Sequence, residues 1–291
     1  MIRKFQSSDI FFDVVGSTRK DTNLFSYEQT KKTIDLVKPD IIINAAAKVG
    51  GILANNTYRT EFILENLKIN LNILESCLGS NQIKIINLGS SCIYPLNAQN
   101  PIGEDSLMKG ELEPTNSPYA LAKIAAIELG RAMNSQYSHQ VINLMPTNLY
   151  GPNDNFTEND SHVIPGLIHK MHIAKIKQSP SFDIWGTGLP LREFLYVDDL
   201  SNAIEFVIKN NITIDLLNIG SGQETSINEL AHEIKKVVGY TGKIQFDESK
   251  PDGNPRKLLD SRKINNLGWN PETTLVDGLK KTYVWYKKNK S

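Results

Sequence analysis

The chain has 291 residues, of which 40% are hydrophobic and 22% are charged, with 32 basic and 32 acidic side chains. This composition is that of a globular protein with one large domain or two modest ones, and it excludes a disordered or fibrous chain. Because the formal net charge is +0, no overall field attracts nucleic acid or an anionic membrane surface. We expect neither as a partner.

Three further features bear on the compartment. The apolar stretches around Ile41–Ala47 and Ile83–Leu88 are interrupted well before the roughly 20 apolar residues that a membrane-spanning helix needs. The apolar run Ile10–Val15 is too short for a signal peptide. The only two cysteines, Cys77 and Cys92, cannot form a disulfide framework. The sequence therefore predicts a cytoplasmic protein without a membrane span.

Short β-branched runs alternate with longer stretches of helical periodicity along the first half of the chain. This alternation predicts right-handed β-α-β units, and therefore an α/β fold with a doubly wound, Rossmann-like parallel sheet. The runs are nearly continuous in apolar character, as expected where helices cover both faces of a sheet. The four predicted strands are Ile10–Val15, Asp40–Asn44, Lys84–Leu88 and Val141–Met145.

The helix expected over Thr60–Leu78 carries two apolar stripes. One includes Leu67 and Leu74, and the other includes Ile69 and Ile73. One sheet face cannot cover both stripes. The second stripe is covered either by neighbouring helices of the same chain or by another subunit.

The pattern loosens after Gly151 into loops rich in Asn, Asp and Pro. We assign residues 1–150 to the sheet domain, and residues 151–291 to a smaller substrate-binding lobe interleaved with the end of the sheet. Helices are expected near Val163–Lys175 and over Ile227–Val238. The second of these begins with a capping box, Ser226-x-x-Glu229, and stops before a glycine.

Ligands of a doubly wound sheet bind beyond the carboxyl ends of its strands, so polar residues that follow the strands are candidates for the site. Tyr119 and Lys123 are one helical turn apart. The ammonium can therefore lower the pKa of the phenol and make it a proton donor and acceptor near neutrality. Spacing alone is weak evidence, because three other tyrosines also have a lysine four residues later: Tyr27, Tyr283 and Tyr286.

The context distinguishes Tyr119 from the other three tyrosines. It follows Pro118, a residue suited to the first turn of a helix, and a serine segment at the end of a predicted strand. Ser90 of that segment could donate a hydrogen bond to the same carbonyl that Tyr119 protonates. The alternative is that Ser90 is a turn residue with a local backbone bond.

Seven segments, in this order along the chain, are similar to those of the GDP-L-fucose synthase family, a group within the extended short-chain dehydrogenases/reductases. The segments are AAAKVGGILANNTY (Ala45–Tyr58), GSSCIYP (Gly89–Pro95), EPTNSPYALAK (Glu113–Lys123), MPTNLYGPNDNF (Met145–Phe156), SHVIP (Ser161–Pro165), REFLYVDD (Arg192–Asp199) and KPDGNPRKLLD (Lys250–Asp260). The resemblance implies a homodimer that epimerises C3 and C5 of GDP-4-keto-6-deoxy-D-mannose and reduces its C4 ketone with NADPH.

The resemblance also implies roles for individual residues. Ser90, Tyr119 and Lys123 match the reductase triad. Cys92 and His162 match the epimerisation pair, which removes and returns protons next to the ketone. Without the resemblance, we would interpret Cys92 as a small buried residue and His162 as a packed or surface residue.

Two sets of ligand-binding residues follow from the same resemblance. The implied cofactor-binding residues for NADP(H) are Arg19, Leu88, Gly89, Ser90, Ser91, Tyr119, Lys123, Pro146, Thr147, Asn148, Leu149 and His162. The implied GDP-sugar-binding residues are Lys170, Trp185, Arg192 and Asp252. Each of the latter has a simpler interpretation as a core aromatic, a surface ion pair or a turn residue. No metal site is expected, because His169 and His172 lack a cluster of further ligands.

One departure from the family concerns the N-terminal strand and the glycine-rich turn G-x-x-G-x-x-G, which this sequence does not match. That turn normally meets the cofactor diphosphate. Residues 1–9 are typical of the remainder of the helix that follows it. Two explanations compete, a start assigned at an internal Met and a relative that has lost the segment. We favour the first, because a sheet without its central strand would expose apolar edges.

Two alternative functions remain open at this stage. One is a related epimerase/reductase that acts on a GDP-4-keto-dideoxyhexose and makes a colitose-type sugar. The other is a GDP-sugar-binding protein that uses no cofactor.

Overall fold

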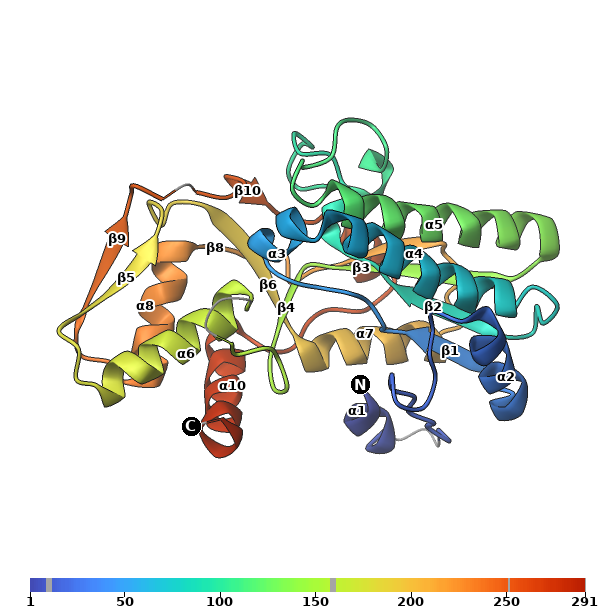
Figure 1. Cartoon of the computed structure of the whole chain (residues 1–291), viewed down its shortest axis with the longest axis horizontal. Helices are drawn as coiled ribbons and strands as arrows, with labels where there is room; N and C mark the ends of the chain where they lie inside the picture. Colours follow the sequence, from blue (N-terminus) through green and yellow to red (C-terminus); the bar gives the residue numbers. More distant parts are fainter. Residues whose placement is uncertain (9–11, 158–160, 251, 291) are drawn as a thin grey trace. The chain divides into compact units, whose positions relative to one another are not determined.

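The computed structural model describes residues 1–8, 12–157, 161–250 and 252–290. The chain divides into two compact units (Figure 1). Unit 1 comprises Met1–Ala98, Glu104–Pro146 and Ser201–Ile219, and unit 2 comprises Gln99–Gly103, Thr147–Leu200 and Gly220–Ser291. The chain therefore enters each unit more than once.

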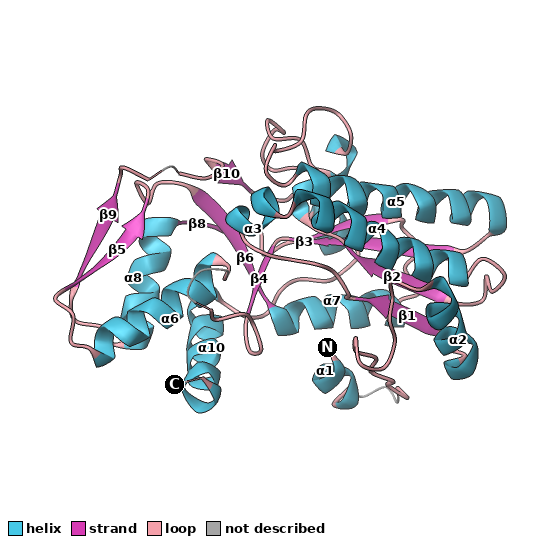
Figure 2. Cartoon of the chain, viewed as in Figure 1, coloured by secondary structure: helices cyan, strands magenta, loops and turns pink. Residues whose placement is uncertain are grey.

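Unit 1 is built on a parallel sheet in the order β1-β2-β3-β7, which confirms the predicted Rossmann-like α/β class. Three of the predicted strands are present. The strands are β1 (Ile41–Asn44), β2 (Lys84–Leu88), β3 (Gln140–Pro146) and β7 (Leu216–Ile219). The helices α4 (Arg59–Ser76) and α5 (Ser117–Tyr137) connect them and lie side by side (Figure 2).

The predicted strand Ile10–Val15 is wrong for residues 12–15, which pair with no strand in the described part of the chain; residues 9–11 lie outside it. An apolar run becomes a strand only where a neighbouring backbone accepts its hydrogen bonds. The residues before it form a short helix, α1 (Ile2–Gln6), as the sequence indicates. Among the described residues, β1 is the edge of this sheet, and Ile41, Ile42 and Ile43 are only half-buried.

Three asparagines form a row across the sheet. Asn44, Asn87 and Asn143 stand opposite one another in the register of β1, β2 and β3. The amide of Asn44 donates to Asn87 Oδ1 at 2.9 Å, and the amide of Asn87 donates to Asn143 Oδ1 at 3.1 Å. All three are buried. Because a buried amide without a partner is costly, this asparagine row fixes the register of the three strands.

The structure separates the apolar residues of α4. Phe62, Ile69 and Ile73 are buried, since α4 packs against α5 and α2 (Tyr27–Val37) of the same chain. In contrast, Leu64 is 47% exposed and Leu71 is 41% exposed. The helix therefore has an apolar face that no other described residue covers.

Unit 2 contains a small mixed sheet and a two-stranded sheet beside three helices. Strand β6 pairs in parallel with β4 and β10 and antiparallel with β8, while β5 pairs with β9. The strands are β4 (Asn148–Tyr150), β5 (Ser181–Trp185), β6 (Leu191–Tyr196), β8 (Glu224–Ser226), β9 (Lys243–Asp247) and β10 (Arg256–Lys257). Helices α6 (Val163–Ile176), α8 (Ile227–Val238) and α10 (Leu275–Asn289) enclose its core.

Helix α8 has the predicted bounds and the predicted capping box. Ser226 accepts from the backbone of Glu229, and Gly239 takes the left-handed conformation at the C-terminus. The remaining elements are α3 (Ile52–Thr57), η1 (Ser91–Ile93), η2 (Glu104–Ser106), α7 (Val197–Lys209) and α9 (Arg262–Asn266). None of the helices within the described ranges is long and apolar enough to cross a membrane.

Candidate active site

The structure brings Ser90, Tyr119 and Lys123 together at the carboxyl end of β2, in unit 1. Ser90 follows the strand and caps η1, where its hydroxyl accepts from the backbone N–H of Cys92 at 3.3 Å. The same hydroxyl is near enough to the Tyr119 phenol to lower its pKa. Lys123 Nζ lies 5.8 Å from the centroid of the Tyr119 ring and donates to Leu88 O at 2.8 Å. Ser90 thus makes both the local bond and the contact with the tyrosine.

Burial dominates the electrostatics of this group. It raises the pKa of Tyr119 well above the usual value, Cys92 adds to this effect, and Ser90 opposes it. The expectation that Lys123 lowers the pKa of the phenol is therefore wrong, because burial raises this pKa. Burial also lowers the pKa of Lys123 to about 8, with the side chain 2% exposed. Tyr119 is a neutral proton donor at neutral pH, and Lys123 is close to its titration point.

A carboxylate fixes the turn that leads into α5. Glu113 accepts from the backbone N–H groups of Thr115 at 3.1 Å and Asn116 at 2.9 Å. Arg59 of α4 donates to Pro114 O in the same turn at 2.8 Å. Because Tyr119 lies in the first turn of α5, these bonds fix the position of the backbone that carries its phenol. The sequence signal for this turn is the acidic residue just before the helix.

The two residues predicted to epimerise the substrate lie in different units. Cys92 is in η1 of unit 1, half-exposed and two residues from Ser90. His162 is exposed at the N-terminus of α6 in unit 2 and makes no capping hydrogen bond with its side chain.

The predicted cofactor residues are divided in the same way. In unit 1, Arg19 is exposed on a turn that Asp21 closes by accepting from the Thr18 backbone at 2.8 Å. Residues 88–91 follow β2, and Pro146 ends β3. A Cβ atom on Gly89 would meet the flexible end of the Met145 side chain, which would have to shift. Unit 2 holds Thr147, Asn148 and Leu149, in the turn and strand just after Pro146.

Three of the four predicted substrate residues gather around one turn of unit 2. Trp185 ends β5 and is 70% exposed. Asp252 accepts from Thr187 N at 3.0 Å and from Thr187 Oγ1 at 2.6 Å, so its carboxylate already holds the turn after Trp185. Burial lowers the pKa of the nearby Arg192, and the charge of Asp252 opposes this shift. The fourth residue, Lys170, is exposed on α6.

Lys250 was not predicted to be part of this group. Its ammonium lies 5.8 Å from the centroid of the Trp185 ring and makes a cation–π contact with it. A lysine in a polar loop gives no sequence signal of such a contact.

Histidines 169 and 172 each face a tyrosine. His169 Nδ1 is 2.8 Å from Tyr286 Oη, and His172 Nδ1 is 3.0 Å from Tyr283 Oη, so both face α10. Across the described residues, no group of three His, Cys, Asp or Glu side chains could hold a metal ion.

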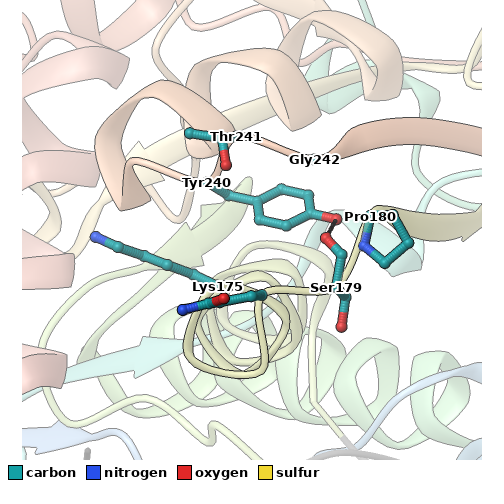
Figure 3. A pocket seen from close by; sticks show the side chains of 7 residues that line it. Lys175, Ser179, Pro180, Tyr240, Thr241 and Gly242 are labelled. Atoms are coloured by element: carbon teal, nitrogen blue, oxygen red, sulfur yellow. Dashed lines mark hydrogen bonds between the residues drawn. The ribbon is translucent and has the colours of Figure 1, made fainter.

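A hollow of about 300 Å³ lies elsewhere in unit 2 and contains none of the predicted site residues (Figure 3). Figure 3 shows Tyr240 reaching toward Ser179, whose carbonyl it bonds at 3.0 Å. Lys175 caps the end of α8 through Val238 O at 2.8 Å. These bonds are structural.

Comparisons with known proteins identify the family of this chain. The model of the NAD dependent epimerase/dehydratase family matches residues 5–220. The chain is 48% identical to GDP-L-fucose synthase 1 of Arabidopsis thaliana, over 99% of this chain and 89% of that protein. It is 36% identical to GDP-L-colitose synthase of Yersinia pseudotuberculosis, over 96% and 92%. A GDP-L-fucose synthetase from Naegleria fowleri bound to NADP superimposes with a TM-score of 0.87 at 31% identity, over 94% and 84%.

Proposed function

Because the chain belongs to the NAD dependent epimerase/dehydratase family and, within it, to the GDP-L-fucose synthases, we propose that it converts GDP-4-keto-6-deoxy-D-mannose to GDP-L-fucose. The reaction epimerises C3 and C5 and reduces the C4 ketone, with NADP(H) as cofactor. The observation that carries the proposal is the contact of Ser90 with Tyr119, beside the buried ammonium of Lys123.

The chemistry of these three groups fits the nicotinamide end of the cofactor. When bound, NADPH would supply the hydride that reduces C4 of the ketone. Tyr119, held neutral by its raised pKa, delivers its hydroxyl proton to the C4 oxygen, so that the carbonyl becomes an alcohol. Ser90 donates a hydrogen bond to the same oxygen while charge develops on it. Lys123 holds the ribose and stabilises the tyrosinate that forms.

The epimerisation requires a base and an acid on opposite faces of the sugar. The C4 ketone acidifies the protons on C3 and C5, so one of Cys92 and His162 removes each proton while the other returns one from the opposite side. The half-exposed position of Cys92 next to Ser90 supports this role. Arg192, Trp185, Asp252 and Lys170 are assigned to the GDP-sugar. Arg192 suits the diphosphate because guanidinium binds such oxygens in pairs.

The test is turnover of the defined substrate. The purified chain is incubated with GDP-4-keto-6-deoxy-D-mannose and NADPH, and the product is identified by chromatography and NMR. Formation of GDP-L-fucose, absent with Tyr119→Phe, is the expected result. Preference for a GDP-4-keto-dideoxyhexose would favour the colitose-type activity, although that relative is less similar to this chain. Binding of GDP-sugar without NADPH consumption would overturn the reductase assignment.

We also propose that the chain forms a homodimer in the cytoplasm. The exposed leucines of α4, together with Leu121 of α5 at 47% exposure, form an apolar face on two adjacent helices. A two-fold axis would pair this face with its copy and bury both. The two cysteines, which form no disulfide, support a reducing compartment.

A further inference from the structure

Glu193 is a fully buried carboxylate that the proposed reaction does not use. It lies on β6 next to Arg192 and is 0% exposed. Oε1 accepts from the backbone N–H of Gly222 at 2.8 Å, and Oε2 accepts from that of Leu259 at 3.1 Å. The amide of Ser221 is a further donor. Both oxygens are thus held by main-chain groups, which offset part of the cost of burying the charge, although burial still raises the pKa of Glu193.

The two loops around this carboxylate are shaped to contain it. A side chain on Gly220 would collide with Oε1 of Glu193 and come within 2.8 Å of Ser261 Oγ. Gly222 has a φ of +70°, a conformation that directs its N–H inward and favours glycine. Residues 220–222 and 259–261 therefore enclose Glu193 from two sides.

The backbone of Glu193 has a different set of partners. Its carbonyl oxygen accepts from Thr147 Oγ1 at 3.2 Å and from Asn148 Nδ2 at 2.9 Å. A side-chain substitution leaves these bonds in place. The carboxylate acts instead on the segment that follows β10, and β10 pairs with β6 so that Lys257 stands opposite Arg192.

We propose that Glu193 is a positioning residue for the nucleotide sugar. By holding Leu259 and the 220–222 loop, its carboxylate keeps β10 against β6 and so fixes the strand from which Arg192 reaches the diphosphate. This inference rests on the proposed function, which assigns a GDP-sugar to Arg192. Glu193 itself has no exposed atom for the ligand.

The experiment measures GDP binding to the whole chain by calorimetry. Glu193→Gln keeps the shape of the side chain but directs an amide N–H₂ at backbone donors. We expect its Kd for GDP to rise at least 10-fold. Glu233→Gln makes the same charge change at an α8 carboxylate that pairs with Lys236, and should leave the Kd unchanged. If the unaltered chain fails to bind GDP, the proposed function is at fault. If it binds GDP and Glu193→Gln binds equally well, the inference is overturned.

A double-mutant cycle separates positioning from a general loss of structure. If Glu193 acts through Arg192, Arg192→Ala should weaken GDP binding less in the Glu193→Gln background than in the unaltered chain, by about 3-fold or more. Additive losses would contradict the proposal. Gly220→Ala, which keeps the carboxylate and crowds it, should reproduce the loss of affinity. If circular dichroism finds both Glu193→Gln and Gly220→Ala unfolded, Glu193 is needed for folding, and the positioning role is rejected.

Discussion

Phe62 of α4 meets Tyr119 of α5 edge to face, with ring centroids 6.4 Å apart and planes at 74°. Phe62 is 2% exposed, so its ring keeps water from one side of the phenol. Phe62 also contacts Lys48, whose Nζ lies 5.8 Å from the centroid of the Phe62 ring. Asn66 fixes the backbone of Lys48 through bonds of 3.0 Å to its N–H and its C=O. The loop after β1 is thereby connected to the surroundings of Tyr119.

Replacing Phe62 by leucine should make the phenol more acidic. Because burial is the largest cause of the raised pKa of Tyr119, water admitted beside the ring should move the alkaline limb of the pH–rate profile for NADPH oxidation to lower pH. The lost packing should also cost about 1–2 kcal/mol in the free energy of unfolding. Leu36→Ala, at a site that is 74% exposed on α2, is the control. An unmoved alkaline limb would show that Phe62 does not shield the phenol.

The stability of the protein should depend on Lys123 between about pH 8 and pH 10.5. Its pKa is about 8 in the folded state against an ordinary 10.5, so in this window the unfolded chain binds a proton that the folded chain does not. The free energy of unfolding should therefore rise with pH there, by at most about 3 kcal/mol from this residue. Below pH 8 both states are protonated, and the cost of the buried charge remains.

Lys123→Met removes this dependence. Urea unfolding at pH 7.5 should give the variant a higher free energy of unfolding than the unaltered chain. At pH 10 this difference should be smaller or absent. Tyrosines with raised pKa values act oppositely above pH 10, but they are present in both proteins and cancel in the difference. A difference in stability that does not vary with pH would mean that Lys123 titrates normally.

The two half-reactions should be separable in a preparation that turns over. Cys92→Ser should slow exchange of the C3 and C5 protons in deuterated water by about 100-fold or more, since an acid–base group is lost. Tyr119→Phe should permit this exchange while reducing NADPH oxidation by a similar factor. Cys77→Ala is the matched control, because Cys77 is buried with its pKa raised to about 11 and remains a thiol. Normal exchange in Cys92→Ser would remove that residue from the mechanism.

Leu71→Arg should produce a monomer. A guanidinium placed on the exposed apolar face of α4 would be buried against its copy across the two-fold axis, without a partner. Sedimentation at micromolar concentration should then give half the mass found for the unaltered chain, whereas Leu36→Arg on α2 should have no effect. A monomer for the unaltered chain itself would refute the dimer.

The elements that the sequence predicted best carry local signals. Strand β2 has the predicted bounds, and α8 begins and ends where its capping box and glycine indicate. The segment Ile10–Val15 has a suitable composition, but a strand also needs a partner, and pairing partners are distant in sequence. The two apolar stripes of α4 are likewise a local pattern that the sequence reveals. The helices that cover one of them are distant in sequence and are known only from the structure.

Within the candidate site, residues that mark the end of a strand or the start of a helix could be foreseen, and residues without such a local signal could not. Ser90 and Tyr119 mark a strand end and a helix start, and such positions converge in a parallel sheet. Glu193 stands in a strand where a carboxylate would normally face solvent. Its donors, Gly222 and Leu259, come 29 and 66 residues later. Only the folded chain shows that Asp252 closes the turn after Trp185.

The asparagine row across β1, β2 and β3 has a consequence for recombining this chain with its relatives. Each amide is matched to the next at one register only. A strand taken from another protein without an asparagine at the same position would break both bonds of the row if it replaced β2, and one bond if it replaced β1 or β3. Chimeras should therefore fold when their crossover points fall outside residues 41–146, so that the three strands are inherited together.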